Sequence, residues 1–180
     1  MKKELLNSLG IIFSAKTFII VSPAICNSIS PPNVVLIIAD DMGWKQLGCY
    51  GSRFYESPEI DRLMSQGMRF TDAYSSAPVS SPTRAALMTG KYPARLHLTD
   101  YVQAPDPADK PVWVKSRQKF LPLEEKTIGE IYQENGYRTA LFGKWHLSLG
   151  KSGPSTIPYN PDKQGFEESF LTFKPSRDLP

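Results

Sequence analysis

The chain has 180 residues, of which 41% are apolar and 22% are charged, and its formal net charge is +3. This composition is typical of one globular domain that is long enough to bury a sizeable core. The small positive charge, with no basic stripe along the sequence, excludes a function that depends on nucleic-acid binding.

The N-terminal residues differ in composition from the rest of the chain. Residues 1–28 begin with a basic stretch, continue with an apolar stretch and end in small residues. That order is typical of a secretory signal peptide, so we expect an exported protein, periplasmic or extracellular, although a disordered or helical leader is the alternative. Cys26 leaves a lipid anchor open as a further possibility. Lys16 interrupts an apolar stretch that is too short to span a bilayer, so we do not expect stable membrane insertion.

Hydrophobic periodicity and turn residues predict six elements after this leader. In chain order they are a strand over 34–38, a helix over 57–67, a strand over 68–76, a helix over 82–89 closed by Gly90, a helix over 127–136 and, within 137–147, a strand that leads into a site-like segment with Lys144 and His146. A long loop rich in proline and charge is expected over 100–120, and a last ordered segment over 165–173. The alternation predicts an α/β fold, with a mostly parallel sheet flanked by helices.

Three of these elements carry specific signals. Residues 34–38 are continuously aliphatic, which is the pattern of a strand buried on both faces of a parallel sheet. Ser57 and Pro58 are typical of an N-cap and a first helical residue. Ser81 and Pro82 predict the same kind of helix start in the next helix.

Polar residues follow three of the predicted strands. They are Asp40 with Asp41, then Ser80, and then Lys144 with His146. Because ligands gather at the carboxyl ends of parallel strands, we expect these three groups to meet at one edge of the sheet.

The acidic pair at Asp40 and Asp41 is costly at the end of a buried strand unless a positive charge lies beside it. A hard divalent cation with oxygen ligands, Ca²⁺ or alternatively Mg²⁺, would balance both carboxylates. A solvated turn that caps the strand is the other reading of this pair.

Ser80 lies just before the predicted start of the helix over 82–89. The free N–H groups of that helix end favour an anion, and Arg84 adds a permanent charge one turn further on. A nucleophile in this position suits the cleavage of a sulfate or phosphate ester. An ordinary helix cap, with Arg84 in a surface ion pair, is the alternative.

Lys144 and His146 are two residues apart, so in an extended segment their side chains leave on the same face. An amine and an imidazole together could bind an anionic substrate and transfer a proton. The alternative is an exposed lysine beside a structural histidine. His97 is interpreted as a structural or rim residue.

These groups, in this order, resemble the type I sulfatases of the alkaline phosphatase-like superfamily. The resemblance is carried by the stretches PNVVLIIADDMGW, SSPTRAALMTGKYPARLHLTDY, GYRTALFGKWHLSLG and GFEESF. The signature C/S-x-P-x-R followed by T-G is present as Ser80-Ser81-Pro82-Thr83-Arg84 with Thr89-Gly90. Thr83 stands where many members have serine.

The resemblance implies a role for each candidate residue. Ser80 would be oxidised to formylglycine by a maturation enzyme and act as the nucleophile on sulfur. Asp40, Asp41 and Ser80 would hold Ca²⁺. Arg84 would stabilise the nucleophile, Lys144 would bind the sulfate group and His146 would support the nucleophile and the elimination of sulfate.

The implied function is hydrolysis of sulfate monoesters on a carbohydrate, aryl or other small molecule, with residues 32–180 as the N-terminal portion of the catalytic domain. Members of the family are several hundred residues long, so we expect a fold that is incomplete at its C-terminus, and this short chain could be inactive. Two alternatives stay open: a phosphoric or phosphonic ester hydrolase that uses unmodified Ser80, and a truncated non-catalytic remnant that at most binds a sulfated ligand.

Overall fold

The computed structural model describes residues 31–105, 117–148 and 157–172. The chain divides into two units, Met1–Ile38 and Ala39–Pro180. The predicted signal peptide over 1–28, and residues 106–116 of the predicted long loop, lie outside the described residues. None of the described helices has both the length and the apolar character that a membrane crossing requires.

The predicted strand over 34–38 is wrong. These residues form neither helix nor strand, and the side chains of Val35 and Ile37 are 82% and 80% exposed. A strand needs a partner to satisfy its backbone groups, whereas aliphatic composition only favours an extended backbone. The segment is apolar, as its sequence indicates, but no strand among the described residues pairs with it.

The predicted strand over 68–76 is also absent. This segment is held by contacts with a short 3₁₀ helix, η1 (Gly48–Tyr50). The Tyr50 hydroxyl donates to the Phe70 carbonyl at 2.8 Å, and the Arg69 guanidinium donates to the Cys49 carbonyl. These side-chain contacts take the place of the strand ladder that the alternating pattern predicted.

The first predicted helix is confirmed as α1 (Pro58–Gln66), with Ser57 as its N-cap and Pro58 as its first residue. The Ser57 hydroxyl does not cap the helix. It accepts from the Gly48 N–H at 2.8 Å and donates to Asp61 at 3.0 Å. Asp61 also accepts from the Cys49 N–H at 2.7 Å, so α1 and η1 are joined by a compact set of polar contacts.

The second helix, α2 (Ser80–Thr89), starts two residues earlier than predicted. Val79 is the N-cap and Ser80 is the first helical residue, so Ser81 is not the cap. The reason is that the Ser81 hydroxyl accepts from the Val102 N–H at 3.1 Å, in a buried contact outside the helix. Gly90 closes the helix at φ +67°, as predicted.

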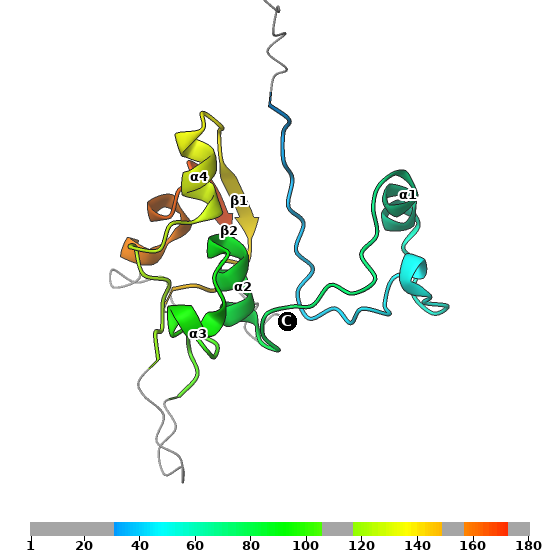
Figure 1. Cartoon of the computed structure of the whole chain (residues 1–180), viewed down its shortest axis with the longest axis horizontal. Helices are drawn as coiled ribbons and strands as arrows, with labels where there is room; N and C mark the ends of the chain where they lie inside the picture. Colours follow the sequence, from blue (N-terminus) through cyan, green and yellow to red (C-terminus); the bar gives the residue numbers. More distant parts are fainter. Residues whose placement is uncertain (1–30, 106–116, 149–156, 173–180) are drawn as a thin grey trace, which may run out of the picture. The chain divides into compact units, whose positions relative to one another are not determined.

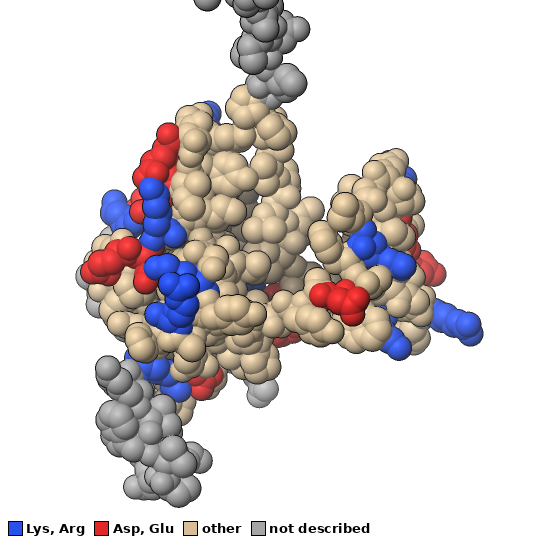
Figure 2. Space-filling model, viewed as in Figure 1, with Lys and Arg blue, Asp and Glu red and all other residues tan. Residues whose placement is uncertain are grey.

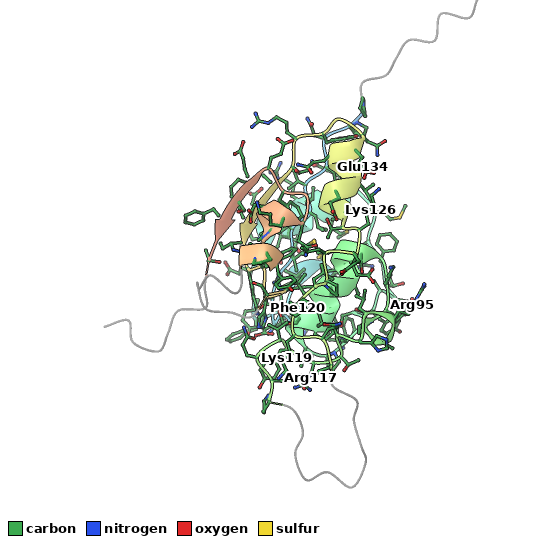
Figure 3. The ribbon with its side chains drawn as sticks, turned by 90° about the vertical axis from the view of Figure 1, so that its left-hand side faces the viewer. Arg95, Arg117, Lys119, Phe120, Lys126 and Glu134 are labelled. Atoms are coloured by element: carbon green, nitrogen blue, oxygen red, sulfur yellow. The ribbon has the colours of Figure 1, made fainter. Side chains whose placement is uncertain are left out.

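The third predicted helix is confirmed as α4 (Ile128–Glu134), and a short helix that was not predicted, α3 (Pro93–Leu96), follows α2. Thr127 and Glu130 form a capping box at the start of α4, because each side chain bonds the backbone N–H of the other residue. Figure 3 labels Lys126, which precedes the N-cap, and Glu134, the last residue of α4; the two side chains form an ion pair.

The predicted parallel pairing is confirmed, in a smaller sheet. Strands β1 (Ala140–Gly143) and β2 (Glu168–Leu171) run parallel, with Ala140 opposite Glu168 and Gly143 opposite Leu171. Between them come the 3₁₀ helices η2 (Ile157–Tyr159) and η3 (Pro161–Lys163). Figure 1 shows the two strands beside α4, with α2 and α3 in the same body.

The core is built around α2, α3 and the segments that follow α3 and β1. Its aromatic part is Trp145 against Phe166, whose rings meet edge to face at 6.0 Å. The other buried apolar side chains are Ala85, Met88, Leu96, Leu98, Val102, Ala104, Leu121 and Leu147. On the surface of this body, Lys and Arg side chains alternate with Asp and Glu side chains (Figure 2), as in the Lys91–Glu125 ion pair.

The start of α4 lies in direct contact with the turn before β2. A Cβ atom on Gly129 would lie 2.7 Å from the Gly165 carbonyl oxygen, and one on Gly165 would lie 2.1 Å from the Glu130 nitrogen. Gly165 also has φ +83°, in the left-handed region that favours glycine. The Thr127 hydroxyl donates to the Gln164 carbonyl at 2.6 Å across the same contact.

Candidate active site

The first turn of α2 holds the centre of the candidate site. Ser80 and Arg84 are four residues apart, so their side chains lie on one face of the helix. The Arg84 Nε donates to the Ser80 Oγ at 3.0 Å. This contact leaves the hydroxyl proton of Ser80 available for a second partner.

That second partner is Asp40. The Ser80 hydroxyl donates to Asp40 Oδ1 at 3.3 Å, and the Arg84 Nη2 donates to the same oxygen at 3.1 Å. One carboxylate oxygen therefore accepts from both the candidate nucleophile and its guanidinium neighbour.

Lys144, directly after β1, completes the cluster. Its ammonium group donates to the other oxygen of Asp40, Oδ2. Its carbonyl accepts from the Arg84 Nη1 at 2.6 Å. Arg84 thus binds all three other members of this group of four residues, which we call the Ser80 cluster (Asp40, Ser80, Arg84 and Lys144).

The Ser80 cluster is partly buried. The Arg84 side chain is 8% exposed, whereas those of Asp40 and Lys144 are 33% and 31% exposed. Burial alone would raise the pKa of Asp40, but hydrogen bonds from Lys144 and Arg84, together with their positive charges, outweigh burial and lower that pKa below its ordinary value. Asp40 is therefore an anion at neutral pH, held between two cations.

His146 and Asp41 are not joined to the Ser80 cluster by a hydrogen bond or ion pair. The His146 Nε2 lies 2.6 Å from Gln103 Oε1. The φ of His146 is +58°, so the backbone there is not the extended strand on which a shared face with Lys144 was predicted. Asp41 has φ +56° and an exposed side chain that, within the described ranges, makes no hydrogen bond. His97 is exposed at the end of α3.

The oxygen atoms of the three predicted metal ligands have the chemistry that a hard divalent cation prefers. Asp40, Asp41 and Ser80 offer two carboxylates and one hydroxyl, whereas Ca²⁺ takes about 6–8 oxygen ligands. The residues that the structure describes contain no group of three or more His, Cys, Asp or Glu side chains placed to hold a metal. These three residues offer the oxygen ligands that calcium prefers, but they would fill only part of its coordination sphere.

Two contacts of the candidate site were missed from the sequence. The Lys144 carbonyl was not foreseen as an acceptor for Arg84, and Gln103 was not foreseen as a partner of His146. A carbonyl has no residue signature, and Gln103 lies in a segment whose pattern predicted only a loop. No signal in a single sequence would have found either one.

One cavity of the described residues lies beside η1 and α1. It has a volume of about 450 Å³, is lined by residues such as Met42, Leu47 and Ile60, and includes no member of the Ser80 cluster.

A family model described as Sulfatase matches residues 32–180. Arylsulfatase A of Homo sapiens is 41% identical over 148 residues, which cover 82% of this chain and 26% of that protein. Steryl-sulfatase of Mus musculus is 37% identical over 138 residues, covering 76% of this chain and 21% of that protein. The chain thus spans roughly a quarter of the length of these curated relatives.

Solved structures give the same picture. A crystal structure of Ps i-CgsB in complex with k-i-k-neocarrahexaose has a TM-score of 0.63 and 35% sequence identity, and the match covers 79% of this chain and 28% of that one. A structure described under the metabolism of multiple glycosaminoglycans by Bacteroides thetaiotaomicron has a TM-score of 0.62 and 36% identity, with 78% and 28% covered.

Proposed function

The chain belongs to the sulfatase family, and from this membership we propose that residues 32–180 form the N-terminal portion of a catalytic domain that hydrolyses sulfate monoesters. The observation that carries the proposal is the Ser80 cluster. A hydroxyl on the first turn of a helix is joined to a guanidinium, a carboxylate and an ammonium group from segments far apart in the sequence. Two cations beside one candidate nucleophile suit an anionic ester.

In this proposal each residue of the cluster has one task. Ser80 provides the nucleophilic oxygen that attacks sulfur. Arg84, fixed by its contact with the Lys144 carbonyl, holds that oxygen in place. The Lys144 ammonium group binds the sulfate oxygens and offsets the charge that develops on them. His146, which lies two residues after Lys144, takes part in proton transfer.

Two groups would complete the chemistry. The first is a formylglycine, which a maturation enzyme would make from Ser80. The hydrated aldehyde of the formylglycine would offer one hydroxyl for attack on sulfur. Deprotonation of its second hydroxyl would then release the sulfate. The second is Ca²⁺, held by Asp40, Asp41 and Ser80, which would lower the pKa of the attacking hydroxyl. The oxygen chemistry of the three residues supports this ion.

We further propose a sulfated glycan as the substrate class. Support comes from the solved relatives, one in complex with k-i-k-neocarrahexaose and another in complex with its substrate D-glucosamine-2-N,6-O-disulfate. The curated relatives named arylsulfatase and steryl-sulfatase keep aryl and steryl sulfates as substrates to be tested beside glycans. Export through a signal peptide over 1–28, to the periplasm or the outside of the cell, belongs to the same proposal, and sequencing the mature N-terminus tests it.

The decisive experiment is a mass measurement on the peptide that contains Ser80, taken from protein made in a host that matures serine-type sulfatases. Formylglycine makes this peptide lighter by one molecule of hydrogen (H₂). The same preparation is then assayed for sulfate release, with Ser80→Ala as the inactive variant. An unmodified peptide together with phosphate ester hydrolysis would overturn the proposal in favour of a phosphoric ester hydrolase. No turnover of either ester by the matured chain would favour a non-catalytic remnant.

A further inference from the structure

The contact between Gln103 and His146 joins two segments that lie 43 residues apart. The Gln103 side-chain oxygen lies 2.6 Å from the His146 Nε2. An amide oxygen can only accept, so the Nε2 of His146 carries the proton in this contact. The basic nitrogen of the imidazole is then Nδ1.

The backbone on both sides of Gln103 is fixed. Val102 and Ala104 are buried, with 1% and 3% of their surface exposed. The Val102 N–H donates to the Ser81 hydroxyl at 3.1 Å. Since Ser81 is the neighbour of Ser80 in the first turn of α2, Gln103 has a fixed place relative to the candidate nucleophile.

Arg117 anchors the other side of this segment. Its Nη2 donates to the carbonyls of Ala104 at 2.8 Å and Pro105 at 2.6 Å, and its Nη1 pairs with Asp100 at 3.1 Å. The Arg117 side chain is 9% exposed, and Figure 3 shows it on the stretch of chain that also carries Lys119 and Phe120. The segment that presents Gln103 is therefore held from two directions.

We infer that Gln103 is a positioning residue for His146. It keeps the proton on Nε2 and orients the imidazole relative to the first turn of α2, through the anchor at Ser81. The inference rests on the proposed function, because the orientation of His146 matters for catalysis only if His146 takes part in proton transfer there. The contact itself can be tested without turnover.

The test uses the full chain labelled with ¹⁵N, because its two histidines give few imidazole signals. Long-range ¹H–¹⁵N spectra report the tautomer and the titration midpoint of His146, and the exposed His97 serves as the internal reference. The variants are Gln103→Leu, which removes the acceptor, and Gln103→Glu, which keeps the shape and adds a negative charge. Gln133→Leu, an exposed glutamine on α4, is the matched control.

We expect the native chain and Gln133→Leu to show one Nε2–H tautomer for His146. Gln103→Leu gives a mixture of tautomers, and Gln103→Glu raises the pKa of His146 by about one unit relative to the native chain, because a carboxylate favours the charged imidazole. His97 stays unchanged in every variant. Identical His146 tautomers and midpoints in all four proteins would overturn the inference.

Activity separates the inference from the function on which it rests. In a matured, active enzyme, Gln103→Leu lowers kcat more than it changes KM, and Gln103→Glu shifts the pH profile of kcat in the direction of the His146 midpoint. A chain that releases no sulfate, yet shows the expected changes at His146, rejects the proposed function and keeps the positioning role of Gln103. If the chain releases sulfate but the His146 signal is unchanged in both Gln103 variants, the proposed function is kept and the positioning role of Gln103 is rejected.

Discussion

Asp40 accepts hydrogen bonds through both of its carboxylate oxygens, from Ser80, Arg84 and Lys144. The sequence predicted that Ser80 and Arg84 would be close, with Ser80 just before a helix start and Arg84 in the first turn; in the structure both lie in α2, one turn apart. It also predicted that Asp40 and Lys144 would come to the same place, from the ends of two strands. Lys144 does follow a strand, whereas Asp40 reaches the cluster without one. The prediction that Asp40 lies close to Ser80 and Lys144 is confirmed, whereas the predicted strand that was to place Asp40 there is absent.

Replacing Asp40 by asparagine tests the charge of the cluster. We expect Asp40→Asn to lower the free energy of unfolding by about 1 kcal/mol at pH 7, a value reduced for the partial exposure of the carboxylate to solvent. Because the pKa of Asp40 is lowered in the folded state, its contribution is present above the unfolded value of 3.8 and is lost as the pH falls through the folded pKa. Urea titrations in calcium-free buffer at several pH values measure the free energy of unfolding of the native chain and of Asp40→Asn. A difference that persists unchanged at pH 2 would contradict this account.

Ser81 was predicted to cap a helix and instead binds a loop. In Ser81→Ala the buried N–H of Val102 loses its acceptor, so we expect the free energy of unfolding to fall by about 1–3 kcal/mol. Ser65→Ala is the matched control, because that hydroxyl is exposed and bonds only within α1, to the Arg62 carbonyl. Chemical denaturation compares the two. Equal and small effects would mean that Ser81 does not hold the loop in solution.

At the scale of elements, the sequence was most informative where the signal is local. Capping and turn residues gave α1 and α4 nearly to the residue, because a helix satisfies its own backbone groups. The short helix α3 was missed, since a single turn carries no periodicity. The strands over 34–38 and 68–76 were wrongly predicted, because pairing depends on a distant partner that one sequence does not reveal.

The contact between α4 and the turn before β2 gives a sharp prediction at this scale. Gly165→Ala brings a Cβ atom onto the Glu130 nitrogen and also places alanine at a positive φ. We expect a loss of at least about 3 kcal/mol in the free energy of unfolding, from overpacking and backbone strain together. Gly136→Ala is the control, because Gly136 has φ +79° with no atom within 4 Å of its added Cβ. That variant should lose only about 1–2 kcal/mol. Similar losses in both would show that the contact with α4 is not tight.

At the scale of the whole molecule, much apolar surface of the described residues is uncovered. Val35 and Ile37 expose most of their side chains, and so do Phe142 and Phe170 on the paired strands. We expect Val35→Lys combined with Ile37→Lys to change the free energy of unfolding by less than about 0.5 kcal/mol, because neither side chain is buried. The same double variant should bind less of a hydrophobic dye and stay monomeric at higher concentration. A large loss of stability would show that this segment is covered in solution.

The residues of the Ser80 cluster are joined across very different distances along the chain, and this sets the order in which they can meet during synthesis. Arg84 follows Asp40 by 44 residues, whereas Lys144 follows Asp40 by 104. At about 5–20 residues per second, a ribosome needs roughly 5–20 s to pass from the aspartate codon to the lysine codon. A nascent chain therefore carries the aspartate, the serine and the arginine for seconds before the ammonium group of Lys144 exists, so Ser80 and Arg84 can bind Asp40 before Lys144 does.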